Sequence, residues 1–362
     1  MRSWRCVVRR VVVAGAAFVA SAASVVNVAA GQVAAPPPAR EGGKVAPLFA
    51  SNDVLQLTLT TDMRSVLRDR DSTDVKDHAA TLAWAEGGAP ATLDVQVRTR
   101  GHWRRQQRNC EFPPLRVTYP KGTRKGTIFA GQGHLKLVTH CRDRDDYEQY
   151  ILGEYLAYRA YNLLTPLSFR ARLARVTYTD ASGRVGPVTR FAMFVEDDAD
   201  VAKRNGAKLL EQKGAAYEDL DLETAALATA FNYMIGNHDW SVFALHNFVL
   251  LRDSLAAPAP VPYDFDFSGL VNTRYAVPPP QVPVKSVTQR YYRGPCLTTE
   301  QWTPILARFT AQRGAIYALY TSLPPLDRKQ AARARDYLDE FYQTIGDRRA
   351  IKRELIDTCK AR

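Results

Sequence analysis

Between residues 54 and 195, apolar residues alternate with polar ones in seven short segments. Alternation places every second side chain on the same face, which is typical of a strand with one buried face. Turn-forming residues interrupt the pattern, as at residues 86–90 and around Ser182 and Gly183. Strands are predicted at residues 54–59, 79–85, 91–100, 115–119, 134–139, 173–179 and 190–195. The first half is therefore expected to be mainly antiparallel sheet.

Apolar residues recur every three to four positions in the second half, and also in one segment between the strands. That earlier segment predicts a helix from Asp145 or Asp146 to a residue before Pro166. Further helices are predicted at residues 62–68, 221–235, 301–322 and 327–345, with a last segment to Cys359. We therefore expect an α+β protein with a β-rich N-terminal lobe at 49–200 and a mainly helical C-terminal lobe at 201–362. Two lobes that share one cleft fit the length of the chain.

The first 30 residues have the composition of a secretory signal peptide. Four arginines occur among the first ten residues, an apolar run follows, and Val28 and Ala30 are small residues at the positions that signal peptidase reads. Residues 1–30 are thus expected to be removed, with an uncleaved membrane anchor as the alternative. Residues 31–48, which contain Pro36, Pro37 and Pro38, are expected to be a disordered linker. No other stretch approaches the roughly 18 apolar residues of a transmembrane segment, so we predict a periplasmic or secreted protein.

Cysteine usage agrees with an oxidising compartment. Once Cys6 leaves with the signal peptide, four cysteines remain, and they allow three pairings. We favour Cys110–Cys141 and Cys296–Cys359, because each pair closes a local part of the chain. A zinc site is the alternative, but the sequence has no Cys-x-x-Cys spacing and no nearby ligand cluster to support it.

The composition is that of an ordinary globular protein, with 46% apolar and 24% charged residues. The net charge of +12 falls to +8 when the four arginines of the signal peptide leave. This charge favours anionic partners such as nucleotides and phosphates, whereas nucleic acid is not expected because export removes it and no recognised binding module occurs. Residues 102–108 combine cations with Trp103, and we interpret them as an exposed loop, with a phosphate or glycan contact as the alternative.

Two segments, 231–247 and 261–269, combine carboxylates and amides with closely flanking apolar residues. The polar residues concerned are Asn237, Asp239, Asn247, Asp264 and Asp266. An ionised carboxylate in apolar surroundings needs a partner, and oxygen ligands suit Mg²⁺, Mn²⁺ or Ca²⁺. The alternative is that these side chains cap helices and turns. We favour a metal or phosphate site.

The order of polar residues along the chain suggests phosphoryl transfer. That chemistry needs a cation for the donor phosphates, a carboxylate near the acceptor hydroxyl and oxygen ligands for a metal ion. Lys136 lies in a predicted strand, and Glu148 and Glu154 follow on the next helix, where an ion pair with Lys136 is feasible. Asp239 and the polar residues after it would then form the catalytic and metal-binding loops.

The chain resembles the spore-coat-protein-H (CotH) kinase-like family, an atypical branch of the protein-kinase fold. The similar segments are Leu93-Asp-Val-Gln-Val-Arg-Thr-Arg-Gly101, the strand and helix around residues 136–159, Arg190-Phe-Ala-Met-Phe-Val-Glu-Asp197, Asn237-His-Asp239 with Asn247, and Asp264-Phe-Asp266-Phe-Ser-Gly269. The resemblance implies a two-lobed protein-kinase-like fold. It also implies transfer of phosphate from ATP, with Mg²⁺ or Mn²⁺, to a protein, envelope or other hydroxyl acceptor.

Residue roles follow from the same resemblance. Asp239 would be the catalytic carboxylate, and Asn247, Asp264 and Asp266 would be the metal ligands. Lys136, held by Glu154, would bind donor phosphates, and Glu196 would contribute to the nucleotide site. Asn247 follows Asp239 by eight residues, whereas protein kinases place this Asn five residues after the catalytic Asp. A noncatalytic, pseudokinase-type envelope or surface interaction protein is therefore the alternative function.

Overall fold

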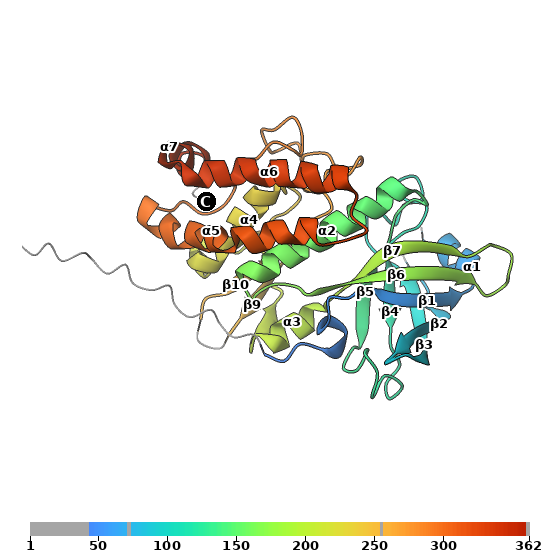
Figure 1. Ribbon diagram of the computed structural model, residues 1–362. Helices are drawn as coiled ribbons and strands as arrows, with labels where there is room; N and C mark the ends of the chain where they lie inside the picture. Colours follow the sequence, from blue (N-terminus) through green and yellow to red (C-terminus); the bar gives the residue numbers. More distant parts are fainter. Residues whose placement is uncertain (1–42, 71–73, 254–255, 360–362) are drawn as a thin grey trace, which may run out of the picture. The chain divides into compact units, whose positions relative to one another are not determined.

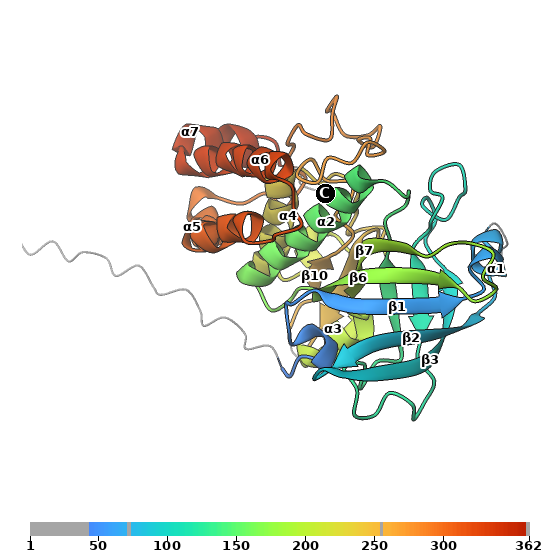
Figure 2. The same cartoon turned by 45° about the vertical axis from the view of Figure 1, so that its right-hand side comes forward.

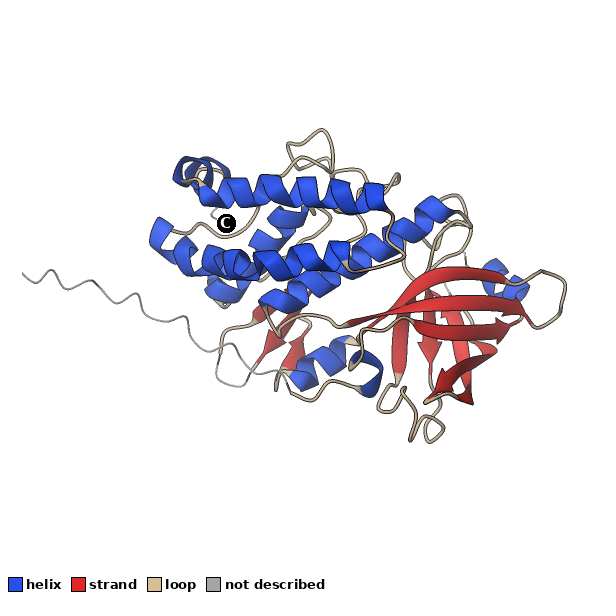
Figure 3. Cartoon of the chain, in the orientation of Figure 1, coloured by secondary structure: helices blue, strands red, loops and turns tan. Residues whose placement is uncertain are grey.

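Seven strands close into a barrel in the order β1-β2-β3-β4-β5-β7-β6 (Figures 1 and 3). Their bounds are β1 Leu55–Thr61, β2 His78–Glu86, β3 Ala89–Thr99, β4 Leu115–Thr118, β5 His134–Val138, β6 Ala171–Asp180 and β7 Val188–Val195. The computed structural model describes residues 43–70, 74–253 and 256–359. The predicted signal peptide and residues 31–42 of the predicted linker lie outside these ranges. All of the described residues belong to one compact unit.

The expectation of a two-lobed protein-kinase-like fold is wrong. The sheet is closed and mixed, because β1 pairs in parallel with β6, with Leu57 beside Val176. A separate three-stranded sheet and seven α-helices complete the described part of the chain, and this is not a typical two-lobed kinase arrangement. Alternation correctly located the seven barrel strands, but the three strands of the small sheet were not predicted, and alternation does not encode which strands pair. The parallel pairing joins segments more than a hundred residues apart.

The barrel core follows from the alternation within each strand. In β3, Leu93, Val95 and Val97 are buried in the barrel core, whereas Arg98 lies on the outer face. Leu48 belongs to the same core with only 1% of its surface exposed, within the 3-10 helix η1 Pro47–Phe49. The last residue of the predicted linker is therefore packed against the barrel.

Helix α2, Asp145–Leu164, connects β5 to β6 and lies between the barrel and the other helices (Figures 1 and 2). It contacts β6 and β7 on one side and α5 on the other. Most of its apolar residues are buried, among them Ile151, Leu152 and Leu156. The helix ends just before Pro166, as predicted, because the residue before a proline disfavours helical backbone angles.

The second half contains most of the helices and a small sheet. Its elements are α3 Asp198–Arg204, β8 Lys208–Leu210, η2 Tyr217–Asp219, α4 Leu222–Ile235, β9 Phe248–Arg252, β10 Ala259–Pro262, α5 Thr299–Thr321, α6 Arg328–Gly346, α7 Arg348–Ile351 and the π-helical turn Lys352–Ile356, while α1 Met63–Arg68 belongs to the first half. Asp221 caps α4 through the Thr224 N–H, and Gly236, with φ of 63°, ends it. A Cβ at Gly236 would lie 2.0 Å from the hydroxyl of Tyr337, so only glycine fits this turn.

Both predicted disulfides are confirmed. Cys110 is bonded to Cys141, and Cys296 is bonded to Cys359. Across the described ranges, none of the helices has both the length and the apolar character needed to cross a bilayer. These two findings are compatible with an extracellular or periplasmic location, where disulfides persist.

Candidate functional site

A cleft of about 880 Å³ lies between the end of β3 and the loops that follow α4 and β10. Its barrel side is lined by Asp74, Val75, Arg98, Thr99, Arg100, Gly101, His102, Trp103, Arg104, Arg105, Pro114 and Arg116. Its other side is lined by Asp239, Leu245, His246, Asn247, Tyr263, Asp264, Asp266 and Phe267. The structure thus brings four of the predicted site residues together in one cleft.

The carboxylate of Asp239 is held by two neighbours from its own loop. Asn247 donates through Nδ2 to the backbone carbonyl of Asp239 at 2.6 Å and to its Oδ2 at 3.2 Å. His246 Nε2 lies 2.9 Å from the other oxygen, Oδ1. This contact raises the pKa of His246, so its imidazolium form is stabilised beside the carboxylate.

Strained backbone is concentrated at this cleft. Leu245, Asn247 and Asp264 have φ values of 51°, 55° and 63°, and the described residues contain only two other non-glycine positions with positive φ, Cys141 and Asn272. Asparagine and aspartate tolerate this conformation better than most residues, whereas leucine rarely adopts it. Surrounding contacts must therefore hold the loop, and such residues cluster at functional sites.

Three acids meet at the inner end of the cleft. Asp266 is 4% exposed and Glu154, from α2, is 1% exposed. Burial, opposed by Arg104 and reinforced by Asp264, raises the pKa of Asp266 to about 7. Burial and the same neighbouring carboxylates also raise the pKa of Glu154, whose oxygens have no hydrogen-bond partner of ordinary geometry among the described residues. Burial among carboxylates thus disfavours the charged form of Glu154.

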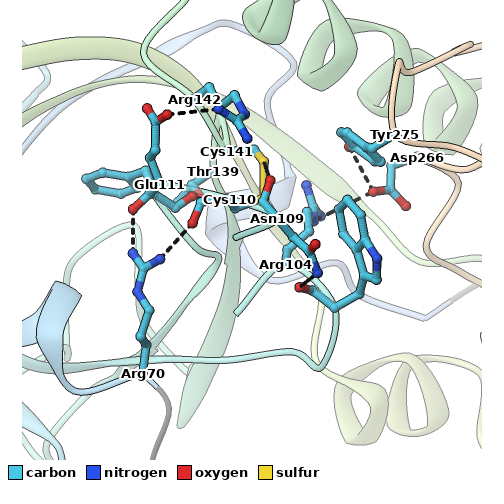
Figure 4. Close-up of a disulfide and its surroundings, with 12 residues drawn as sticks. Arg70, Arg104, Asn109, Cys110, Glu111, Thr139, Cys141, Arg142, Asp266 and Tyr275 are labelled. Carbon is cyan, nitrogen blue, oxygen red and sulfur yellow. Dashed lines mark hydrogen bonds and ion pairs between the residues drawn. A yellow bond between two sulfur atoms is a disulfide. The ribbon is translucent and has the colours of Figure 1, made fainter. Parts of the chain in front are cut away.

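Arg104 is the cation among these acids (Figure 4). Its Nε lies 3.6 Å from Asp266 Oδ2, which also accepts a hydrogen bond of 3.0 Å from the hydroxyl of Tyr275. Burial disfavours the charge of Arg104, but Asp266 and the other acids outweigh burial and raise its pKa. The buried carboxylate therefore has the partner that its desolvation demands.

A disulfide anchors the loop that presents Arg104. Cys110, at the end of that loop, is joined to Cys141 just after β5 (Figure 4). Trp103 of the same loop packs against Phe267 and Tyr275, with ring centroids 5.7 and 5.0 Å apart. Residues 102–108 form a loop that is exposed at both ends, as expected, but Arg104 is only 9% exposed and lines the cleft.

The barrel side of the cleft is rich in arginine. Arg98 lies 3.8 Å from Asp77, and Arg104 is paired with Asp266. The guanidinium groups of Arg100, Arg105 and Arg116 have no hydrogen bond or ion pair with another described residue. The sequence indicated a phosphate contact only as an alternative for residues 102–108, and the contribution of Arg98, Arg100 and Arg116 was missed, although the close spacing of Arg98 and Arg100 was a visible signal.

Three predicted site residues, Lys136, Glu154 and Glu196, do not line the cleft. Lys136 bonds Asp198 at 2.6 Å instead of Glu154, and its ammonium group lies over the ring of Tyr263. Glu196 forms a buried ion pair with Arg204 at 2.9 Å. The expected Lys136–Glu154 pair is thus absent from the structure, because Glu154 points towards Asp266 and Arg104.

The alternative partner for Lys136, Glu148, is also engaged elsewhere. It forms ion pairs with Arg175 and Arg190, two cations of the neighbouring strands β6 and β7. Both glutamates of α2 are therefore separated from Lys136. The strand and helix were predicted correctly, but the rotation of the helix against the barrel depends on tertiary packing.

No group of three or more His, Cys, Asp or Glu side chains within the described ranges is arranged to hold a metal ion. Asp266 is engaged by Arg104 and Tyr275 and also interacts with the neighbouring Asp264. Mg²⁺ is commonly bound by one or two carboxylates together with substrate phosphates and water. The described side chains thus form no ready-made cation site, and a metal ion here would need further oxygen ligands.

When the chain is compared with known proteins, no family model matches it and no curated protein shows significant similarity to it.

Proposed function

We propose that this protein is an exported phosphotransferase that moves a phosphoryl group from ATP or another phosphate donor to a hydroxyl acceptor. The observation that carries the proposal is the opposition of two walls in one cleft. Asp239, held by Asn247 and His246, faces a wall of arginines. Carboxylate and guanidinium groups are the chemistry that a hydroxyl acceptor and a phosphate donor require. Membership of the CotH kinase-like family is part of this proposal.

In the proposed reaction, Asp239 orients the acceptor hydroxyl and accepts its proton. The acceptor oxygen forms a bond to phosphorus, and the donor P–O bond breaks with its electron pair leaving on the donor oxygen. Asn247 keeps the Asp239 carboxylate in position, and the arginines neutralise charge on the phosphates. Mg²⁺ or Mn²⁺, when bound near Asn247, Asp264 and Asp266, would supply further charge neutralisation.

Transfer of radiolabelled phosphate from ATP, with Mg²⁺ or Mn²⁺, tests the proposal. Asp239→Asn keeps the size of the side chain but removes its basicity, so transfer should fall at least 100-fold while thermal unfolding is nearly unchanged. Asp336→Asn, an exposed position on α6 outside the cleft, is the matched control and should retain full transfer. Equal transfer by the Asp239→Asn variant and the wild type would remove Asp239 from the mechanism.

One observation favours the alternative, a noncatalytic interaction protein. Lys136 and Glu196, the residues expected at the nucleotide, are both engaged in internal ion pairs. A folded, disulfide-bonded protein that transfers no phosphate and binds no phosphate ligand would establish that alternative.

A further inference from the structure

We infer that the arginine wall of the cleft is a subsite for a chain of linked phosphates, and that it accepts inorganic oligophosphates as readily as nucleotides. The inference deepens the proposed function, because it names the class of phosphate donor.

Three cations lie side by side across three neighbouring strands. Arg98 of β3 is directly opposite Arg116 of β4, and Arg116 is directly opposite Lys136 of β5. All three lie on the outer face of the barrel, since the residues beside them in each strand are buried in its core. Like charges placed directly opposite one another destabilise a sheet, so this row requires anions.

Acidic side chains satisfy only the two ends of the row. Lys136 is paired with Asp198 at 2.6 Å, and Arg98 lies 3.8 Å from Asp77. Arg116, in the middle, has no such partner, and its buried Nε has no hydrogen bond among the described residues. Burial and the neighbouring Arg98 lower its pKa. A buried donor without a partner is costly, and an anionic ligand would satisfy it.

Two further arginines line the cleft near Arg116. Arg100 follows Arg98 by two residues and lines the same cleft, and Arg105 lines it from the adjacent loop. Adjacent strands are about 4.8 Å apart, and two residues along a strand span about 6.6 Å. The backbone positions of Arg98, Arg100 and Arg116 are therefore spread over about 5–7 Å in two directions. A row of linked phosphates carries charge along its length and matches this spread.

The cleft is lined by many charged side chains, but the two residues predicted to contact the nucleotide are not among them. Neither Lys136 nor Glu196 lines it, and Glu196 is sequestered with Arg204. Arginine binds phosphate through two parallel hydrogen bonds and needs no base or sugar for that contact. The opposite wall carries Asp239, so a phosphate held on the arginines faces the proposed acceptor site.

Isothermal titration calorimetry on the full disulfide-bonded chain tests this subsite. The ligands are inorganic tripolyphosphate, ATP, adenosine and inorganic phosphate, each with and without Mg²⁺. We expect tripolyphosphate and ATP to bind within about threefold of each other, phosphate to bind at least tenfold more weakly, and adenosine not to bind. If ATP bound tenfold more tightly than tripolyphosphate, the cleft would recognise the nucleoside, and the claim that it accepts both ligands equally would be wrong. If tripolyphosphate did not bind, the proposed subsite would be wrong.

Two arginine variants locate the binding. Arg116→Gln and Arg100→Gln should each weaken tripolyphosphate binding at least tenfold. Arg184→Gln removes the same charge from an exposed position between β6 and β7, outside the cleft lining, and should leave binding unchanged. Equal weakening in all three variants would show nonspecific attraction to a basic protein and would overturn the inference. Arg116→Gln should fold at least as stably as the wild type, because it removes an unpaired charge.

The binding and transfer results separate the two proposals. Tripolyphosphate binding that depends on Arg116 but is followed by no transfer would support the subsite and contradict the phosphotransferase. Transfer from ATP by a protein that does not bind tripolyphosphate would support the phosphotransferase and contradict the subsite. Asp239→Asn should abolish transfer from either donor while tripolyphosphate affinity stays within twofold of wild type.

Discussion

Asn247 holds Asp239 through a single amide group that donates to both the backbone carbonyl and the carboxylate, at 2.6 and 3.2 Å. The two residues are eight positions apart, and the intervening loop returns through Leu245 in a left-handed conformation. This double contact fixes the direction of the proposed catalytic carboxylate. Substitutions at Asn247 should therefore distinguish the positioning of Asp239 by the amide from the cost of the left-handed backbone at residue 247.

Asn247→Gly and Asn247→Ala both remove the amide, but only glycine adopts φ of 55° without steric cost. Both variants should lose phosphate transfer at least tenfold, because Asp239 is no longer held. The alanine variant should also be less stable than the glycine variant by about 1 kcal/mol in denaturant unfolding. Full transfer by the glycine variant would show that the amide has no positioning role.

Arg104→Met should reduce the free energy of unfolding by about 2–4 kcal/mol, because Asp266 would remain buried without its cation. Adding Asp266→Asn should restore most of the loss, since an uncharged amide needs no counterion. Urea unfolding of the two single variants and the double variant measures the coupling directly. Additive losses in the double variant would show that the two side chains do not stabilise one another.

The two disulfides should differ in their effect on the cleft. Replacing Cys110 and Cys141 by serine opens a loop of 31 residues and should cost about 3–4 kcal/mol, and replacing Cys296 and Cys359 opens one of 63 residues at a similar cost of about 4 kcal/mol. Only the first replacement loosens the loop that presents Arg104. It alone should weaken tripolyphosphate binding, which calorimetry on both variants would measure.

His140 should make the protein less stable in mild acid. Burial lowers the pKa of His140 to about 4, and its ring is stacked on Phe112 with centroids 4.7 Å apart. The unfolded chain binds this proton near pH 6.5, so stability is complete above that pH and decreases as the pH falls towards 4. Between pH 7 and pH 5 the loss from this group should be about 2 kcal/mol.

His140→Phe preserves an aromatic ring that cannot be protonated, and so isolates the contribution of His140. The pH dependence of its unfolding free energy should be smaller than that of the wild type by the same amount. Parallel pH profiles for the two proteins would contradict a neutral buried His140.

Much of the local structure was predictable from neighbouring residues. The strand at Leu115 and the end of α2 before Pro166 follow from alternation and from proline geometry, which involve only a few consecutive residues. Asp239 and Asp264 were recognised as members of one site because carboxylates in apolar segments need partners. The structure places both in the same cleft, whereas their catalytic and metal-binding roles stay proposals.

The pairing of distant segments was not predictable in this way. Closure of the barrel depends on Leu57 lying beside Val176, and the ion pairs of Lys136 and Glu154 depend on how α2 rotates against the strands. Alternation specifies which face of a strand is buried, but side-chain packing between remote segments selects its partner. The arginine wall arises in the same way, because Arg98 and Arg116 become neighbours only when β3 and β4 pair.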